Sequence, residues 1–157
     1  MTNEKKIRIF TKIIIIIIML LGVYGVVPGT LADIMKDKVE EGYEYSTVYK
    51  TKVNGEYELS NVKISDPEGI EYLWGNLEET EVSFKKVTRP PELTDGEVWY
   101  EITDMQHIKS MQITDSGEVY TMAFHIPQFS VVYSISEEEV QVLFERINQI
   151  REIYGEE

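Results

Sequence analysis

The chain has 157 residues, with 28 acidic and 15 basic side chains, a net charge of −13 at pH 7 and no cysteine. The absence of thiols excludes a disulfide framework, a thiolate nucleophile and a thiolate metal site. The negative charge disfavours nucleic acid as a partner, because its phosphates would repel the protein. We therefore expect no nucleic-acid partner, and a domain whose stability comes from its hydrophobic core alone.

The most informative segment is an uninterrupted apolar run at residues 13–27, which opens with six isoleucines. The basic residues that precede it are Lys5, Lys6, Arg8 and Lys12. A basic flank before an apolar run is typical of an export or membrane-insertion signal, and the flank stays on the cytoplasmic side. The pattern therefore predicts that everything after Pro28 lies outside the cytoplasm.

Residues 1–32 are either a retained membrane anchor or a cleaved signal peptide. The apolar run is short for a spanning helix, which needs ~20 residues, and long for a signal peptide. Its strongly apolar isoleucines favour an anchor in the plasma membrane. The alternative is cleavage near Ala32, after the small residues Thr30 and Ala32, which would release a secreted protein. Residues 33–42 are then predicted to form a charged stalk.

Residues 43–157 are predicted to form one extracytoplasmic domain. Residues 1–32 hold only one acidic and four basic side chains, so the rest of the chain holds 27 acidic and 11 basic ones, a net charge of −16. Such a charge keeps a domain soluble, and it favours a basic partner over an acidic one.

A hairpin is predicted at the start of this domain. Residues 43–53 alternate as in a strand, and Asn54-Gly55 is the preferred two-residue hairpin turn. This turn fixes a register in which Tyr45 lies opposite Ile64. One face of the hairpin is then apolar near its base.

A short middle helix is expected next, because Asp66 suits the N-cap and Pro67 the first helical position. Gly69 and Gly75 are expected to limit this helix to two turns at most. Further strands are predicted at residues 81–87, 97–103, 107–114, 118–125 and 129–135.

The hairpin around Asp115-Ser116-Gly117 has two possible registers. Pairing Asp115 with Glu118 gathers five apolar side chains on one face: Met111, Ile113, Tyr120, Met122 and Phe124. The alternative is a three-residue loop with Thr114 opposite Glu118, which would place the two histidines opposite each other as a possible start to a metal site. This one-residue slip would scatter the apolar set, so we expect the apolar register. It sends His107 and His125, the two histidines of the chain, to opposite faces, and we therefore expect no metal site between them.

The clearest helix is at the C-terminus, where Ser136 and Glu139 have the spacing of a capping box. An apolar stripe at helical spacing follows, formed by Val140, Leu143, Phe144, Ile147, Ile150 and Tyr154. Strands first and a long helix last predict an α+β fold. We expect a mostly antiparallel sheet with the short middle helix, and the amphipathic C-terminal helix packed on one face.

No nucleophile elbow, phosphate loop, calcium loop or metal-ligand cluster is visible, so we expect no enzymatic activity and no cofactor. Partner binding is a hypothesis for exposed aromatic residues and for a proline-stiffened loop between two strands. The candidate residues are Arg89, Pro90, Pro91, Tyr45, Tyr49 and Trp99. The competing explanation is packing, because tyrosine and tryptophan also suit half-buried strand positions.

The leading hypothesis is a small, non-catalytic extracytoplasmic module that binds a protein or cell-envelope partner. One alternative is an inhibitor or immunity-type protein whose acidity matches a basic target. Another is a small hydrolase that uses carboxylates, with Glu97 or Glu101 as nominal candidates. The format resembles that of many small bacterial cell-surface proteins, a likeness that rests on no specific motif.

Overall fold

The computed structural model describes residues 28–35, 44–89, 91–106, 109–123 and 126–156. Within these residues, eight strands form one antiparallel sheet in the order β3-β7-β6-β5-β4-β1-β2-β8, and three helices accompany it. The predicted α+β fold is therefore confirmed. The apolar run at 13–27 lies outside these ranges, and none of the helices inside them is long and apolar enough to cross a membrane.

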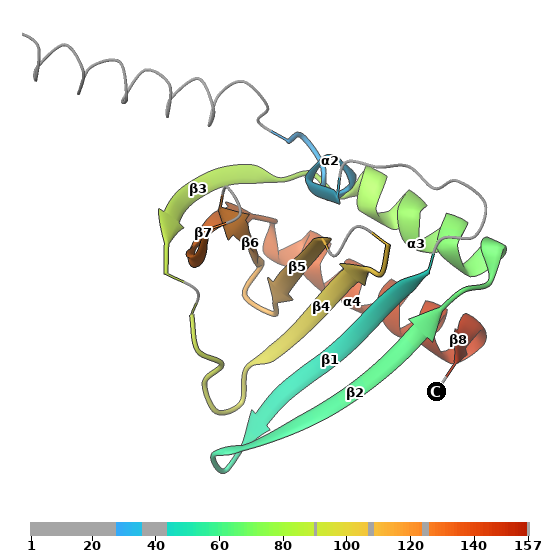
Figure 1. The fold of residues 1–157 in the computed structure, drawn as a ribbon, viewed down its shortest axis with the longest axis horizontal. Helices are drawn as coiled ribbons and strands as arrows, with labels where there is room; N and C mark the ends of the chain where they lie inside the picture. The colour runs from blue at the N-terminus through green and yellow to red at the C-terminus, as the bar shows by residue number, and fades with distance from the viewer. Residues whose placement is uncertain (1–27, 36–43, 90, 107–108, 124–125, 157) are drawn as a thin grey trace, which may run out of the picture.

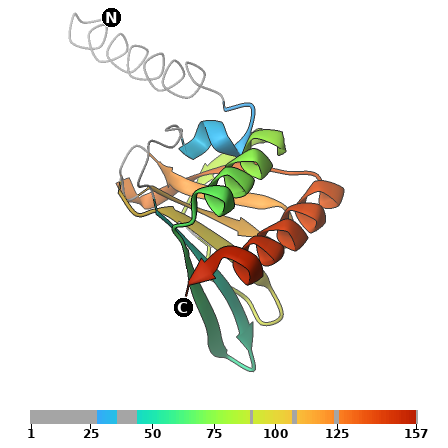
Figure 2. The same ribbon diagram turned by 90° about the vertical axis from the view of Figure 1, so that its right-hand side faces the viewer.

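The strands are β1 (Tyr45–Val53), β2 (Glu56–Ile64), β3 (Ser83–Thr88), β4 (Val98–Asp104), β5 (Lys109–Thr114), β6 (Glu118–Ala123), β7 (Ile126–Ser134) and β8 (Gly155–Glu156). The helices are α2 (Leu31–Met35), α3 (Pro67–Glu79) and α4 (Glu137–Tyr154). In Figure 1, α4 runs behind the middle of the sheet, and Figure 2 shows α3 and α4 together on this side. The core lies between these helices and one face of the sheet.

The β1–β2 hairpin has the predicted register, with Tyr45 opposite Ile64 and Val53 opposite Glu56. Asn54 and Gly55 both have positive φ, 53° and 83°. This is the backbone of the turn type whose twist matches that of two antiparallel strands. The prediction is confirmed because a two-residue turn leaves no freedom to slip.

Helix α3 begins as predicted, with the Asp66 side chain accepting hydrogen bonds from the backbone N–H of Glu68 and Gly69. Its predicted length was wrong, because the helix has 13 residues and passes through both glycines. The face that it buries, formed by Ile70, Leu73, Trp74 and Leu77, outweighs the low helix propensity of glycine. At position 69 only glycine fits, since a Cβ there would lie 2.6 Å from the Tyr154 Cβ.

The predicted register of the β5–β6 hairpin was wrong. Gln112 lies opposite Tyr120 and Met111 opposite Thr121, so the turn has three residues and ends at Gly117 with φ of 79°. The apolar pattern misled because both faces of the sheet are buried here. Tyr120 is 7% exposed on the face away from the helices. His107 and His125 lie outside the described residues.

Helix α4 has the predicted capping box between Ser136 and Glu139, and five of the six stripe residues are buried. In the centre, the Phe144 ring meets the Tyr100 ring edge to face, with centroids 4.7 Å apart. Near its end, the Arg151 guanidinium donates to Thr47 of β1 and to Ser60 of β2. These contacts fix the helix across the sheet.

The segment before the domain is part of the core as far as the structure describes it. Leu31 of α2 is 0% exposed, and its N–H donates to Thr80 O over 3.0 Å. A second hydrogen bond joins the same two segments, since the Val82 N–H donates to Gly29 O over 2.9 Å. Met35, which lies in the segment predicted to form a stalk, is also buried. Residues 36–43 lie outside the described ranges.

Candidate functional site

An open groove of about 750 Å³ lies between α3 and α4. Its lining residues are Glu68, Glu71, Tyr72, Gly75, Asn76, Glu79, Arg146, Gln149, Ile150, Ile153 and Tyr154. A smaller hollow of about 260 Å³ lies beside it toward the start of α4, lined by Asn76, Glu79, Thr80, Glu138, Glu139, Val142, Leu143 and Arg146. Since the two share three residues, we treat them as one groove, called the α3–α4 groove below.

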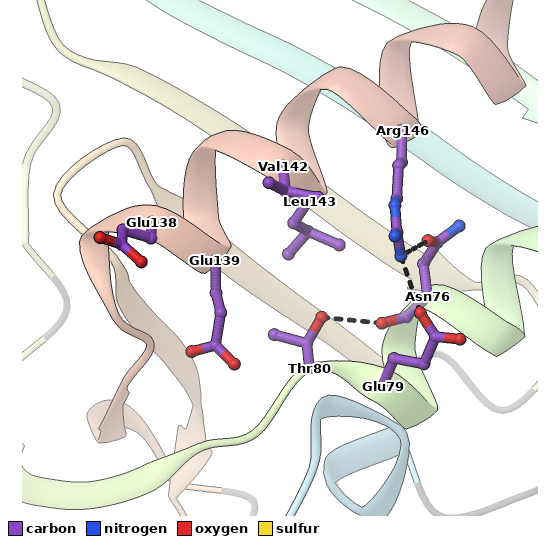
Figure 3. Close-up of a pocket in the computed structure, with 8 residues that line it drawn as sticks. All are labelled: Asn76, Glu79, Thr80, Glu138, Glu139, Val142, Leu143 and Arg146. Carbon is purple, nitrogen blue, oxygen red and sulfur yellow. Dashed lines mark hydrogen bonds and ion pairs between the residues drawn. The ribbon is translucent and has the colours of Figure 1, made fainter.

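Arg146 bridges this groove from α4 to α3, as Figure 3 shows. Its Nη1 donates to Asn76 Oδ1 and pairs with Glu79 Oε2, each over 2.8 Å. On the α3 side, the Thr80 hydroxyl donates to the Asn76 carbonyl over 2.7 Å. The bridge connects the two helices and lies where the two hollows meet, so we call the hollow of about 750 Å³ the wide half of the groove and the hollow of about 260 Å³ the narrow half.

The wide half exposes apolar surface. Tyr72 is 57% exposed and Ile153 is 70% exposed, although both stand beside the buried stripes of their helices. The Tyr72 ring stacks on the Tyr154 ring, with centroids 6.1 Å apart. Nothing lies within 4 Å of the position of a Cβ at Gly75. Aromatic rings next to open space are a common anchor surface for a binding partner.

The rim of the groove is acidic. Its carboxylates belong to Glu68, Glu71, Glu79, Glu138 and Glu139, and its single basic lining residue, Arg146, is already paired. Desolvation and the nearby Glu68 carboxylate raise the pKa of the Tyr154 phenol above its usual value. Apolar anchors under a negatively charged rim suit a partner that carries apolar and basic side chains.

The aromatic residues proposed for partner binding do not come together. Tyr45 is 1% exposed and faces the core, and the half-buried Tyr49 meets Tyr100 on the same face, with ring centroids 5.5 Å apart. Trp99 is 5% exposed on the opposite face, where it stacks on Tyr120. Packing is therefore the role that the structure gives Tyr45 and Trp99.

The proline-stiffened loop also lies against the body of the protein. Arg89 is exposed and Pro91 is half-buried, whereas Pro90 lies outside the described residues. Further along, Leu93 is 5% exposed. The Gly96 N–H donates to Lys52 O over 2.9 Å, which ties the loop to the β1–β2 hairpin. Leu93 and Gly96 thus attach this loop to the body of the protein, while Glu92, Thr94 and Asp95 stay exposed.

The carboxylates considered for catalysis have structural partners. Glu97 accepts hydrogen bonds from the N–H and the hydroxyl of Thr94. Glu101 pairs with Lys50 and accepts from Gln112. Within the part of the chain that the structure describes, no three acidic or histidine side chains are grouped as a metal site would need.

Three large apolar residues are a signal in the sequence for the groove. Tyr72 and Ile153 are large apolar residues that fall off the buried stripes of their helices, as does Val142. On an isolated helix such residues are unremarkable. Only the packing of α3 beside α4, which joins residues 67 to 79 with residues 137 to 154, gathers them at one place.

The chain is thus a small α+β domain with an acidic, partly apolar groove between two helices. Comparison with protein-family models, with curated proteins and with solved structures gives no match. Function must therefore be argued from the surface of this molecule.

Proposed function

We propose that this protein is a non-catalytic extracytoplasmic module, held at the membrane by its N-terminal segment, that binds a protein partner in the α3–α4 groove. The observation that carries the proposal is the exposed pair Tyr72 and Ile153 beneath an acidic rim. The partner is a segment with basic and apolar side chains. Helices that present apolar residues at helical spacing commonly bind in such grooves.

The position of α2 supports a retained anchor over a cleaved signal peptide. Cleavage after Ala32 would remove Leu31 and Ala32, which are 0% and 6% exposed, from the core. It would also remove the backbone hydrogen bonds that Gly29 and Leu31 make with the segment after α3. A processing site is normally an exposed, extended segment outside the fold. The domain therefore needs residues on the membrane side of the predicted cleavage site.

The groove is tested with a synthetic helical peptide of lysine and leucine, titrated into the full-length protein by calorimetry. We expect Tyr72→Ala to weaken binding by about tenfold, which corresponds to about 1.4 kcal/mol and is typical of an aromatic anchor. Because the rim is acidic and the peptide is basic, added salt should also weaken the binding of the peptide to the parent protein.

The matched control is Tyr57→Ala on β2. Tyr57 is 58% exposed, almost the same as Tyr72 at 57%, but it does not line the groove. It should leave binding unchanged. If both variants lost the same affinity, or if a glutamate–leucine peptide bound equally well, the groove would not be the binding site.

A further inference from the structure

One edge of the sheet is open over most of its length. Strand β8 covers the outer side of β2 only at Lys63 and Ile64. From Glu56 to Val62, β2 pairs with β1 on one side, and no strand among the described residues pairs with its other side. An open edge offers unpaired N–H and C=O groups to another strand.

The register of the hairpin shows which residues offer these groups. The two residues that flank a two-residue turn, Val53 and Glu56, are a hydrogen-bonded pair, and the pattern then alternates along the strands. Tyr57, Leu59 and Asn61 therefore turn their backbone groups outward. The same alternation turns Lys52 toward β4, where its carbonyl accepts from Gly96.

Two large apolar side chains are exposed at this edge, next to the charged Glu56 and Glu58. Tyr57 is 58% and Leu59 is 62% exposed, and both stand on the face away from the helices. Proteins usually protect an open edge with lysine, proline or a bulge. The sequence from Glu56 to Val62 contains no lysine and no proline, and its pairing with β1 is regular.

A second observation points to an anionic group at this edge. The Arg151 guanidinium is half-buried beside β2, and its hydrogen bonds go to neutral groups of Thr47 and Ser60. No carboxylate of the described residues forms an ion pair with it. Desolvation lowers the pKa of Arg151. Apart from these groups, the guanidinium carbon lies 5.8 Å from the centroid of the Tyr100 ring. A carboxylate brought next to Ser60 would give this half-buried charge an ionic partner.

We propose that the β2 edges of two copies of this chain pair antiparallel about a two-fold axis at Leu59. Leu59 then lies opposite Leu59 of the second copy, and Tyr57 opposite Asn61 of the second copy, so all outward backbone groups find partners. Glu58 lies opposite Ser60 of the second copy, and therefore beside its Arg151. The two-fold axis creates this ion pair twice.

Neighbouring registers are less favourable. An axis at Glu58 would place two glutamates directly opposite each other, which destabilises an antiparallel pair. An axis at Ser60 would place the strand residue Tyr57 opposite Lys63, whose outer side β8 already occupies, whereas the axis at Leu59 brings only the turn residue Gly55 to this position. The register centred on Leu59 is thus the one that the residues specify.

Single cysteines test this register, because the chain has none of its own. The full-length protein is purified in mild detergent, and disulfide formation is followed under gentle oxidation. Leu59→Cys should crosslink to a dimer, since hydrogen-bonded pairs have Cα atoms ~5.5 Å apart, within disulfide range. Tyr57→Cys alone should not, because the two sites would lie four residues apart along the strands, ~13 Å.

A mixture of Tyr57→Cys and Asn61→Cys chains should crosslink to each other. Glu58→Lys in the Leu59→Cys background should slow crosslinking, because it removes the pair with Arg151. Equal crosslinking of Leu59→Cys and Tyr57→Cys would indicate random collision within the micelle and would overturn the proposal. The proposal would also be overturned if the Leu59→Cys protein stayed monomeric and melted like the parent. The open edge would then be available to a strand of another protein.

Discussion

The role of α2 gives the most direct test of the architecture, through Leu31→Ala in the full-length chain. Leu31 is 0% exposed, and its helix packs against α3 and β5. Replacing a fully buried leucine by alanine typically costs ~2–5 kcal/mol, because apolar contact is lost and a cavity remains. A domain of this size has a total stability of ~5–15 kcal/mol. The variant should therefore lose a large part of its stability.

The assay is thermal unfolding in mild detergent, followed by the fluorescence of Trp74 and Trp99, which are both buried. For a domain of this size, a loss of ~3 kcal/mol lowers the midpoint by roughly 10 °C. Ile153→Ala is the matched control, since it also truncates an aliphatic side chain, but one that is 70% exposed. It should melt close to the parent.

A Leu31→Ala midpoint equal to that of the parent would refute the reasoning. Helix α2 would then be an appendage that contributes nothing to the cooperative core. Cleavage near Ala32 would again be compatible with a stable domain, and the support for a retained anchor would disappear.

Two further predictions follow from local structure. Gly75→Ala should stabilise α3 by about 1 kcal/mol, because it replaces a helical glycine where no atom is in the way. Gly69→Ala should instead destabilise the protein, because the new side chain would force Tyr154 aside. Urea unfolding of the two variants measures both changes. Hydrogen bonds from Lys85 and Tyr120 hold the pKa of Glu118 below 4.5, the usual value for a glutamate. This carboxylate therefore stabilises the fold above pH 4.5 and loses its contribution as the pH falls through the lowered pKa. Glu118→Gln should thus be less stable than the parent at pH 7, and the difference should shrink below about pH 4; a constant difference would contradict the assignment.

The elements predicted correctly are those specified by local chemistry. Asn54-Gly55 fixes a hairpin register, and Ser136 with Glu139 fixes a helix start, whatever the rest of the chain does. Both features are found as expected. The α+β class follows from the order of such elements along the chain, and for that reason it was also predictable.

The errors arose where distant contacts decide. Helix α3 passes through Gly69 because its buried face packs against the rest of the protein, and Tyr154, from the far end of the chain, occupies the space that a side chain at position 69 would need. The β5–β6 register depends on Trp99, against which Tyr120 stacks on a face that the apolar pattern treated as exposed. The groove depends on the packing of two helices between which strands β3 to β7 lie along the chain. None of these contacts leaves a periodic signal in the sequence.

The two proposed surfaces respond to salt in opposite directions, and this separates them in one experiment. The α3–α4 groove attracts a basic peptide, so screening by salt weakens that complex. Two copies of this chain each carry a net charge of −13 and repel each other at long range, so salt favours their pairing through β2. The Glu58–Arg151 pairs oppose this trend only weakly, because partly exposed ion pairs contribute ~0–1 kcal/mol each. We therefore expect that increasing salt raises the crosslinking of Leu59→Cys and, at the same time, lowers the affinity for the peptide.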